Sequence, residues 1–129
     1  MNKKSSEDII KDLVSKSRKA QSVFEKYNQQ EVDEVVTAVA WSLCKPLNNK
    51  KISDLAVDAT GLGNSNHKIL KNKRKTLGLL RDLKNIKTVG VISEDKKKGI
   101  VEIAKPVGIV AAITPSTNPA ATPINNIMN

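Results

Sequence analysis

The chain has 129 residues, and 22 Lys and Arg against 13 Asp and Glu give it a formal net charge of +9. This length is enough for one domain with a real core, although only three aromatic residues are present, so aliphatic side chains must supply the packing. The single cysteine, Cys44, excludes an internal disulfide and fits a reducing cytosol. No apolar stretch approaches the roughly 18–20 residues of a membrane span, and the N-terminus lacks a signal-peptide apolar region, so we expect a cytoplasmic protein without a membrane partner.

Two amphipathic helices are predicted first. Residues 5–26 begin with Ser5 and Asp8 in the spacing of a capping box, and apolar residues then recur at helical intervals. A second helix begins at Asn28, carries a stripe of valines and ends at Pro46, which cannot continue a helix.

Two more helices follow. The third is shorter and stops at the glycines of 61–63, and the fourth runs from 65 to about 83. The outer face of the fourth helix is very basic, with Lys71, Lys73, Arg74 and Lys75. We expect the helices to pack on one another through Val35, Val39, Leu55, Leu77 and Leu80.

The hydrophobic period then changes to that of strands. Residues 88–93 and 100–104 are short β-branched runs, and the polar, glycine-ended segment 94–99 joins them. This pattern predicts a β-hairpin. Its lysine run, 96–98, is interpreted as a solvated hairpin tip.

Residues 107–113 are the most informative segment. This apolar run predicts a strand buried on both faces, as in a parallel sheet, whose neighbouring strands this chain does not supply. The polar loop 114–119 follows, and Asn118 with Pro119 predicts a helix start there. Ligands bind at such strand-to-helix edges of α/β sheets, where backbone N–H groups are free to donate. The same residues are equally compatible with a role limited to capping the helix.

Three other candidate sites lack the sequence signals of catalysis, metal binding or dinucleotide binding. Cys44 ends an apolar helix stripe and is interpreted as a packed core residue. His67 has no partner for catalysis or metal binding nearby in the sequence, so a surface position is expected. The glycines of 61–63 lack the preceding strand that a dinucleotide fingerprint requires. We expect no metal site.

The block from Gly99 to Pro119, GIVEIAKPVGIVAAITPSTNP, resembles the N-terminal part of the CoA-acylating branch of the aldehyde dehydrogenase superfamily. The likeness extends back through 87–92, 74–83 and 60–64, and within the branch it is greatest for acylating sulfoacetaldehyde dehydrogenases. The resemblance implies an α/β fold with N-terminal helices, a β-hairpin arm and the first strand of a Rossmann-like parallel sheet. Residues 1–129 would then be an incomplete cofactor-binding domain, with the catalytic domain beyond residue 129.

The resemblance also implies an oxidoreductase. In this family a cysteine thiolate attacks the aldehyde, hydride passes to NAD or NADP, and the acyl group is transferred to coenzyme A. Thr117 and Asn118 match the position that donates a hydrogen bond to the oxyanion, and which of the two donates stays open. Ile113, Thr114, Pro115 and Ser116 match the backbone beside the nicotinamide ribose. The hairpin 88–104 matches an arm that pairs subunits of a homo-oligomer.

Two further expectations follow. Cys44 does not match the motif of the nucleophile, so the chain by itself is expected to be inactive, and its unpaired strand 107–113 is expected to promote association while the helices persist. The alternative function is a basic helical module that binds an acidic partner or nucleic acid. Binding to random DNA that weakens steeply with salt would favour that alternative. The apolar run 107–113 argues against a helical binding module, so we expect no nucleic-acid partner.

Overall fold

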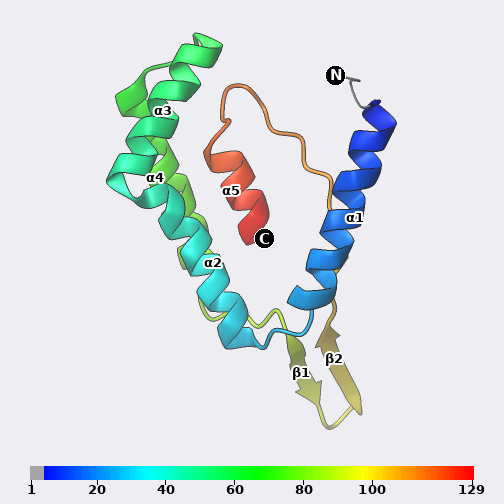
Figure 1. The fold of residues 1–129 in the computed structure, drawn as a ribbon. Helices are drawn as coiled ribbons and strands as arrows, with labels where there is room; N and C mark the ends of the chain where they lie inside the picture. The colour runs from blue at the N-terminus through cyan, green and yellow to red at the C-terminus, as the bar shows by residue number, and fades with distance from the viewer. Residues whose placement is uncertain (1–4) are drawn as a thin grey trace. The chain divides into compact units, whose positions relative to one another are not determined.

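A computed structural model describes residues 5–129, which fold into two compact units (Figure 1). One unit joins the residues up to Gln30 with Lys87–Ala111, and the other joins Glu31–Ile86 with Ala112–Asn129. The described elements are α1 (Ser6–Phe24), α2 (Gln29–Cys44), α3 (Pro46–Thr60), α4 (Ser65–Leu83), β1 (Gly90–Asp95), β2 (Ile100–Ala104) and α5 (Ala121–Met128).

Helix α1 opens the first unit and starts where the capping box predicts. The Ser5 hydroxyl accepts a hydrogen bond from the Asp8 backbone N–H at 3.1 Å and donates one to the Asp8 carboxylate at 2.7 Å. No residue of α1 is buried, and the side chains of Ile9 and Leu13 remain about half exposed. The apolar stripe of this helix therefore has no covering surface within residues 5–129.

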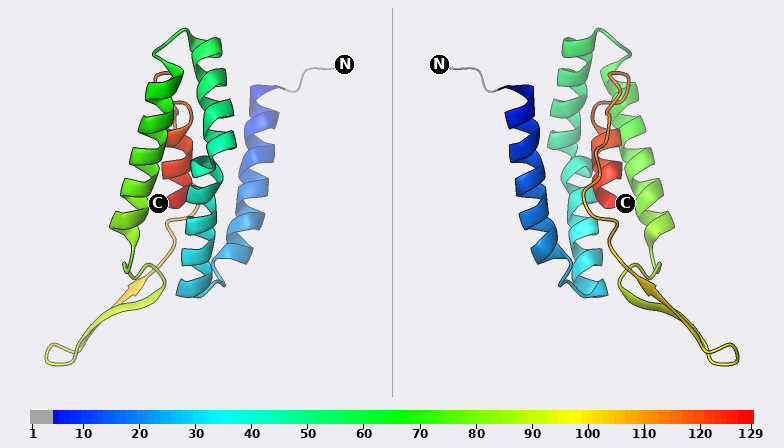
Figure 2. Two further views of the ribbon diagram at one scale, coloured as in Figure 1. Left: turned by 90° about the vertical axis from the view of Figure 1, so that its left-hand side faces the viewer. Right: turned by 90° about the vertical axis from the view of Figure 1, so that its right-hand side faces the viewer.

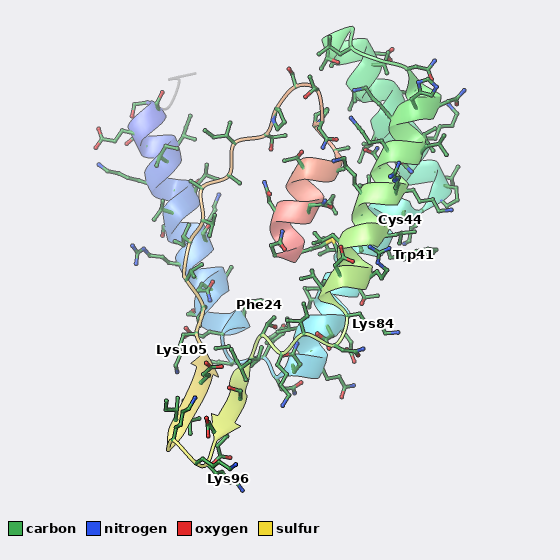
Figure 3. All side chains as sticks on the ribbon, turned by 180° about the vertical axis from the view of Figure 1, so that it is seen from behind. Phe24, Trp41, Cys44, Lys84, Lys96 and Lys105 are labelled. Atoms are coloured by element: carbon green, nitrogen blue, oxygen red, sulfur yellow. The ribbon has the colours of Figure 1, made fainter. Side chains whose placement is uncertain are left out.

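The hairpin of the first unit confirms the predicted strands. β1 and β2 pair antiparallel from Gly90 opposite Ala104 to Asp95 opposite Ile100. At the turn, the Asp95 carboxylate accepts hydrogen bonds from the backbone N–H groups of Lys97 and Lys98 at 3.0 and 3.1 Å. Figure 3 shows Lys96 at the tip of the hairpin, as expected for a solvated lysine run.

The predicted buried strand 107–113 does not form in this structure. The segment has no strand assignment, and Val107 and Ile113 are 90% and 95% exposed. A parallel strand needs neighbours to satisfy its backbone N–H and C=O groups, and no described segment pairs with it. The prediction of burial is therefore wrong for this structure, because residues 5–129 contain no strand that pairs with the segment.

The second unit is built on helices whose ends follow local rules. Pro46 is the first residue of α3, directly after α2 ends at Cys44. At the other end of α3, Gly61 adopts a φ of 64°, the left-handed conformation of a helix C-terminus. After a short turn, the side chain of Asn64 accepts a hydrogen bond from the His67 N–H at 3.2 Å and caps α4. Figure 2 shows the resulting pair of neighbouring helices, α3 and α4.

The contact between α3 and α4 is polar rather than apolar. Asn49, Ser53, Asn72 and Thr76 are all at most 2% exposed. By contrast, Leu55 is 61% exposed and Leu77, Val35 and Val39 are not buried either. The prediction that the helices pack through these residues is therefore wrong, since none of the set is buried and only Val39 and Leu80 are half-buried. A third or more of the surface of Leu55 and Leu77 is left for other protein to cover.

The short helix α5 packs along α4 and also contacts Leu43 at the C-terminal end of α2. Leu43, Ala120 and Ala121 form a buried apolar cluster, and Ile124 packs against it. The helix begins at Ala121, so the predicted start at Asn118 and Pro119 is wrong. The Asn118 backbone N–H is instead bonded to the Pro115 carbonyl at 3.1 Å, which closes a turn before the helix.

Candidate functional site

The loop that precedes α5 contains all the candidate site residues, 113–118, and α4 holds it in place. The Nζ of Lys71 donates a hydrogen bond to the Thr117 carbonyl oxygen at 3.1 Å, and the Nζ of Lys68 lies 3.5 Å from the same oxygen. Lys68 is only 6% exposed, and the Thr117 carbonyl oxygen is the acceptor nearest to its Nζ in this contact. Two cations on successive turns of α4 therefore fix the backbone of the loop.

The two candidate oxyanion donors differ in how firmly they are held. The Asn118 amide donates to the Thr122 hydroxyl at 2.8 Å, which orients the side chain on the first turn of α5. The side-chain oxygen of Asn118, Oδ1, is buried and has no hydrogen-bond partner among the described residues. The side chain of Thr117 is exposed. The structure thus brings both candidates to one loop and fixes only the Asn118 side chain.

The residues matched to cofactor binding are open to solvent. Ile113, Thr114, Pro115 and Ser116 are all exposed, and no hydrogen bond engages the Thr114 or Ser116 hydroxyl within residues 5–129. Such free hydroxyl and backbone groups fit contacts with the hydroxyls of a nucleotide ribose. Acidic or thiol ligands for a metal do not gather here, since residues 5–129 contain no group of three or more His, Cys, Asp or Glu with suitable placement.

Two hollows are lined by α4, and of these two the smaller includes a residue of the loop, Thr117. The smaller, about 260 Å³, includes Leu62, Asn64 and Thr117 in its lining. The larger, about 760 Å³, runs along α4 toward its C-terminal half and reaches Asn125 of α5. His67 and Lys71 line both hollows.

This basic groove between α4 and α5 is what the sequence interpretation missed. The face of α4 with Lys71, Arg74 and Lys75 was expected to be an outer face, and Arg74 and Lys75 are exposed, but the hollow that they line with Lys71 and His67 was not predicted. The spacing was the available signal, because residues 67, 71, 74, 75 and 78 recur on one helical face. The spacing does not predict which other element lies beside that face, which in the structure is α5 through Asn125.

Burial shifts the pKa of one groove lysine. The pKa of Lys71 is lowered below its usual range by desolvation, and the positive charges of Lys68 and Lys75 lower it further. The protonated form of Lys71 is therefore less favourable here than in water. An anion bound beside it would reverse that effect.

Cys44 is a packed residue, as expected. It is 8% exposed, and burial raises the pKa of its thiol, an effect that the nearby Lys73 charge only partly opposes. Figure 3 shows Cys44 and Trp41 on α2. Among the described residues, Cys44 is a free cysteine and has no hydrogen-bonded base. His67 is exposed in the first turn of α4, also as expected.

Comparison with known proteins finds relatives that share this segment. The chain is 54% identical over 122 residues to the acylating sulfoacetaldehyde dehydrogenase of Cupriavidus necator, a match that covers 95% of this chain and 25% of that enzyme. A sulfoacetaldehyde dehydrogenase from Acholeplasma is 46% identical over 92% of this chain and 24% of its own length. The chain is homologous to a segment of the acylating aldehyde dehydrogenases. It spans about a quarter of the length of these relatives.

A solved structure confirms that the segment has the aldehyde dehydrogenase fold. The acetylating aldehyde dehydrogenase of Geobacillus thermoglucosidasius superposes with a TM-score of 0.89 at 36% identity, over 94% of this chain and 26% of that one. No protein-family model matches the chain. No helix in residues 5–129 is both long and apolar enough to cross a membrane.

Proposed function

We propose that this chain is the N-terminal segment of an oxidoreductase that converts an aldehyde, NAD(P) and coenzyme A into an acyl-CoA, with sulfoacetaldehyde as the favoured substrate. The homology to sulfoacetaldehyde dehydrogenases over 95% of the chain carries this proposal. It also accounts for the exposed apolar surfaces of α1 and of segment 107–113, which in a larger fold would be covered.

The loop 113–118 would contribute at the reacting carbonyl. Attack on an aldehyde turns its oxygen into an oxyanion, and donors already held in place stabilise that charge best. Asn118 is the better candidate, because Thr122 orients its amide and one N–H hydrogen stays available after that bond. Thr117, one residue earlier, presents its backbone carbonyl to Lys71 and leaves its side chain unheld.

The cofactor would lie against residues 113–116. Their exposed backbone and the two free hydroxyls would bind the ribose next to the nicotinamide, and the nicotinamide, when bound, supplies the hydride acceptor. The chain's own residues in this step would orient the ring and cover one of its edges. Coenzyme A would be a co-substrate of the whole enzyme.

The hairpin 88–104 would be an oligomerisation arm. Val91, Ile100 and Ile103 are each about half exposed, and a two-stranded sheet has two open edges. Such an arm is marginal alone and gains stability by pairing with a partner, so a homo-oligomer of the whole enzyme is part of this proposal.

A hybrid enzyme tests the proposed function. In this hybrid, the 122 matched residues of this chain replace the corresponding segment of the Cupriavidus necator enzyme. We expect reduction of NAD(P) that requires both sulfoacetaldehyde and coenzyme A, at a rate within about tenfold of the parent enzyme. A folded hybrid that binds neither cofactor nor aldehyde would contradict the proposal.

A further inference from the structure

We infer that the groove between α4 and α5 binds the anionic group of the aldehyde substrate, with Lys71 and Arg74 as its ligands. This inference rests on the proposed function and adds to it the residues that select an aldehyde carrying a sulfonate over a neutral one. The first observation is the charge of the groove. Lys71, Arg74 and Lys75 line it, against the single carboxylate of Asp82 at its far end.

These cations are not neutralised within the described residues. The Asp82 carboxylate is bonded to Arg81, at 2.8 Å, rather than to a groove cation. The remaining ion pairs of residues 5–129 involve Lys11, Lys16, Lys50 and Lys98. A concave surface lined by unpaired cations attracts anions and raises their local concentration.

The second observation is where the groove begins. Lys71 lines both hollows, and its Nζ lies 3.1 Å from the Thr117 carbonyl oxygen in the loop of the candidate oxyanion donors. Arg74 follows one turn further along α4, about 4.5 Å along the helix axis. In the inferred complex, the anionic tail of an aldehyde held at the loop would contact Lys71 first and Arg74 next along α4.

The third observation is the state of Lys71. Burial and the charges of Lys68 and Lys75 lower its pKa, so its environment lacks negative charge. A bound sulfonate supplies that charge. Arg74 adds a planar fork of N–H donors, which can bind two oxygens of one sulfonate at once. Asn125 lines the same groove from α5 and offers an amide there.

The test uses the hybrid enzyme, in which kcat and KM are measured with sulfoacetaldehyde and with the neutral propionaldehyde. For Arg74→Gln we expect kcat/KM to fall about tenfold or more with sulfoacetaldehyde, mainly through KM, and to change less than about twofold with propionaldehyde. Arg74→Lys should recover part of the loss. Lys73→Gln, an exposed cation of the same helix outside the groove, is the matched control and should change neither.

Two results would overturn the inference. An equal loss with both aldehydes would mean that Arg74 serves the fold. A rise in KM for coenzyme A, with the aldehyde KM unchanged, would mean that the groove binds the phosphates of coenzyme A instead.

A binding measurement separates this inference from the proposed function. Isethionate, an unreactive sulfonate, is titrated into the 129-residue chain and followed by NMR. Saturable chemical-shift changes at Lys71 and Arg74 that Arg74→Gln abolishes would support the anion site. If the hybrid enzyme then turned over no aldehyde, the missing turnover would count against the proposed function alone. Shifts that equal those caused by chloride at the same ionic strength would overturn it.

Discussion

The side-chain Nδ2 of Asn72 lies 3.0 Å from the Oδ1 of Asn49, in a contact between α3 and α4 where both residues are only 2% exposed. Asn72 also donates to the Ser53 hydroxyl at 3.2 Å, and Asn49 donates to the Ile69 carbonyl at 3.0 Å. These bonds connect the two helices through the side chains of Asn49, Ser53 and Asn72 and the backbone carbonyl of Ile69. They fix α4, and thereby the two lysines that hold the loop at Thr117.

Asn72→Ala should destabilise the second unit. The change removes one of two hydrogen-bond partners from the buried Asn49 oxygen and from the buried Ser53 hydroxyl, which then retain only their bond to each other, at a cost of about 1–3 kcal/mol. Denaturant unfolding followed by helical circular dichroism measures the loss. Asn66→Ala, at an exposed position of the same helix, is the control and should change stability by less than about 0.5 kcal/mol. Equal effects of the two changes would contradict the importance of this contact.

Helix ends were predictable because they depend on neighbours in sequence. Ser5 caps α1, Pro46 starts α3 and Gly61 ends it, and each signal lies within a few residues of its effect. The exception is the start of α5, which was predicted at Asn118 and lies at Ala121. The backbone N–H of Asn118 closes a turn onto the Pro115 carbonyl, and the Asn118 side-chain amide donates to the Thr122 hydroxyl.

Buried faces were not predictable, because they depend on distant partners. The polar contact of Asn49 with Asn72 joins residues 23 apart, and the anchor between Lys71 and Thr117 joins residues 46 apart. The candidate loop itself was found from sequence, since the change from apolar to hydroxyl residues at 113–118 is local. The basic groove beside it was not, since α5 supplies one of its walls.

Cys44 should react slowly with thiol reagents. Burial raises its thiol pKa, so at neutral pH the native chain holds less reactive thiolate than the unfolded chain does. Alkylation by iodoacetamide, followed from pH 7 to pH 10, should be slower than in denatured chain throughout that range. The same shift predicts stability that is fully present below the unfolded thiol pKa and is lost as pH rises through the folded one. Equal rates in native and denatured chain would contradict the buried assignment.

The segment 107–113 should exchange its amide hydrogens quickly in the 129-residue chain. It has no strand partner among the described residues, whereas the amides within α3 and α4 are bonded inside their helices. Hydrogen exchange read out by NMR compares them directly. Because the segment is apolar and unpaired, association should also increase with concentration, and Val110→Lys should reduce it. Slow exchange across 107–113 in a monomer would contradict this account.

Substitution of the hairpin should weaken assembly of the hybrid enzyme. Ile103→Asp places a charge on the half-exposed β2 strand, where the proposed arm would pair with another subunit. Analytical ultracentrifugation should show a smaller species at the same protein concentration. Lys97→Gln at the hairpin turn is the control and should leave the assembly intact. An unchanged assembly in both variants would exclude the arm from the interface.

The most direct test of the central claim is the turnover rate of the hybrid enzyme after substitution of the loop. Asn118→Ala should lower kcat about 10²–10³-fold, because a held donor to the oxyanion is lost, with the aldehyde KM little changed. Thr117→Ala keeps its backbone carbonyl for Lys71 and should cost less than about fivefold. The reverse order would transfer the donor role to Thr117. Full kcat in both variants would contradict the claim that this loop belongs to the catalytic site.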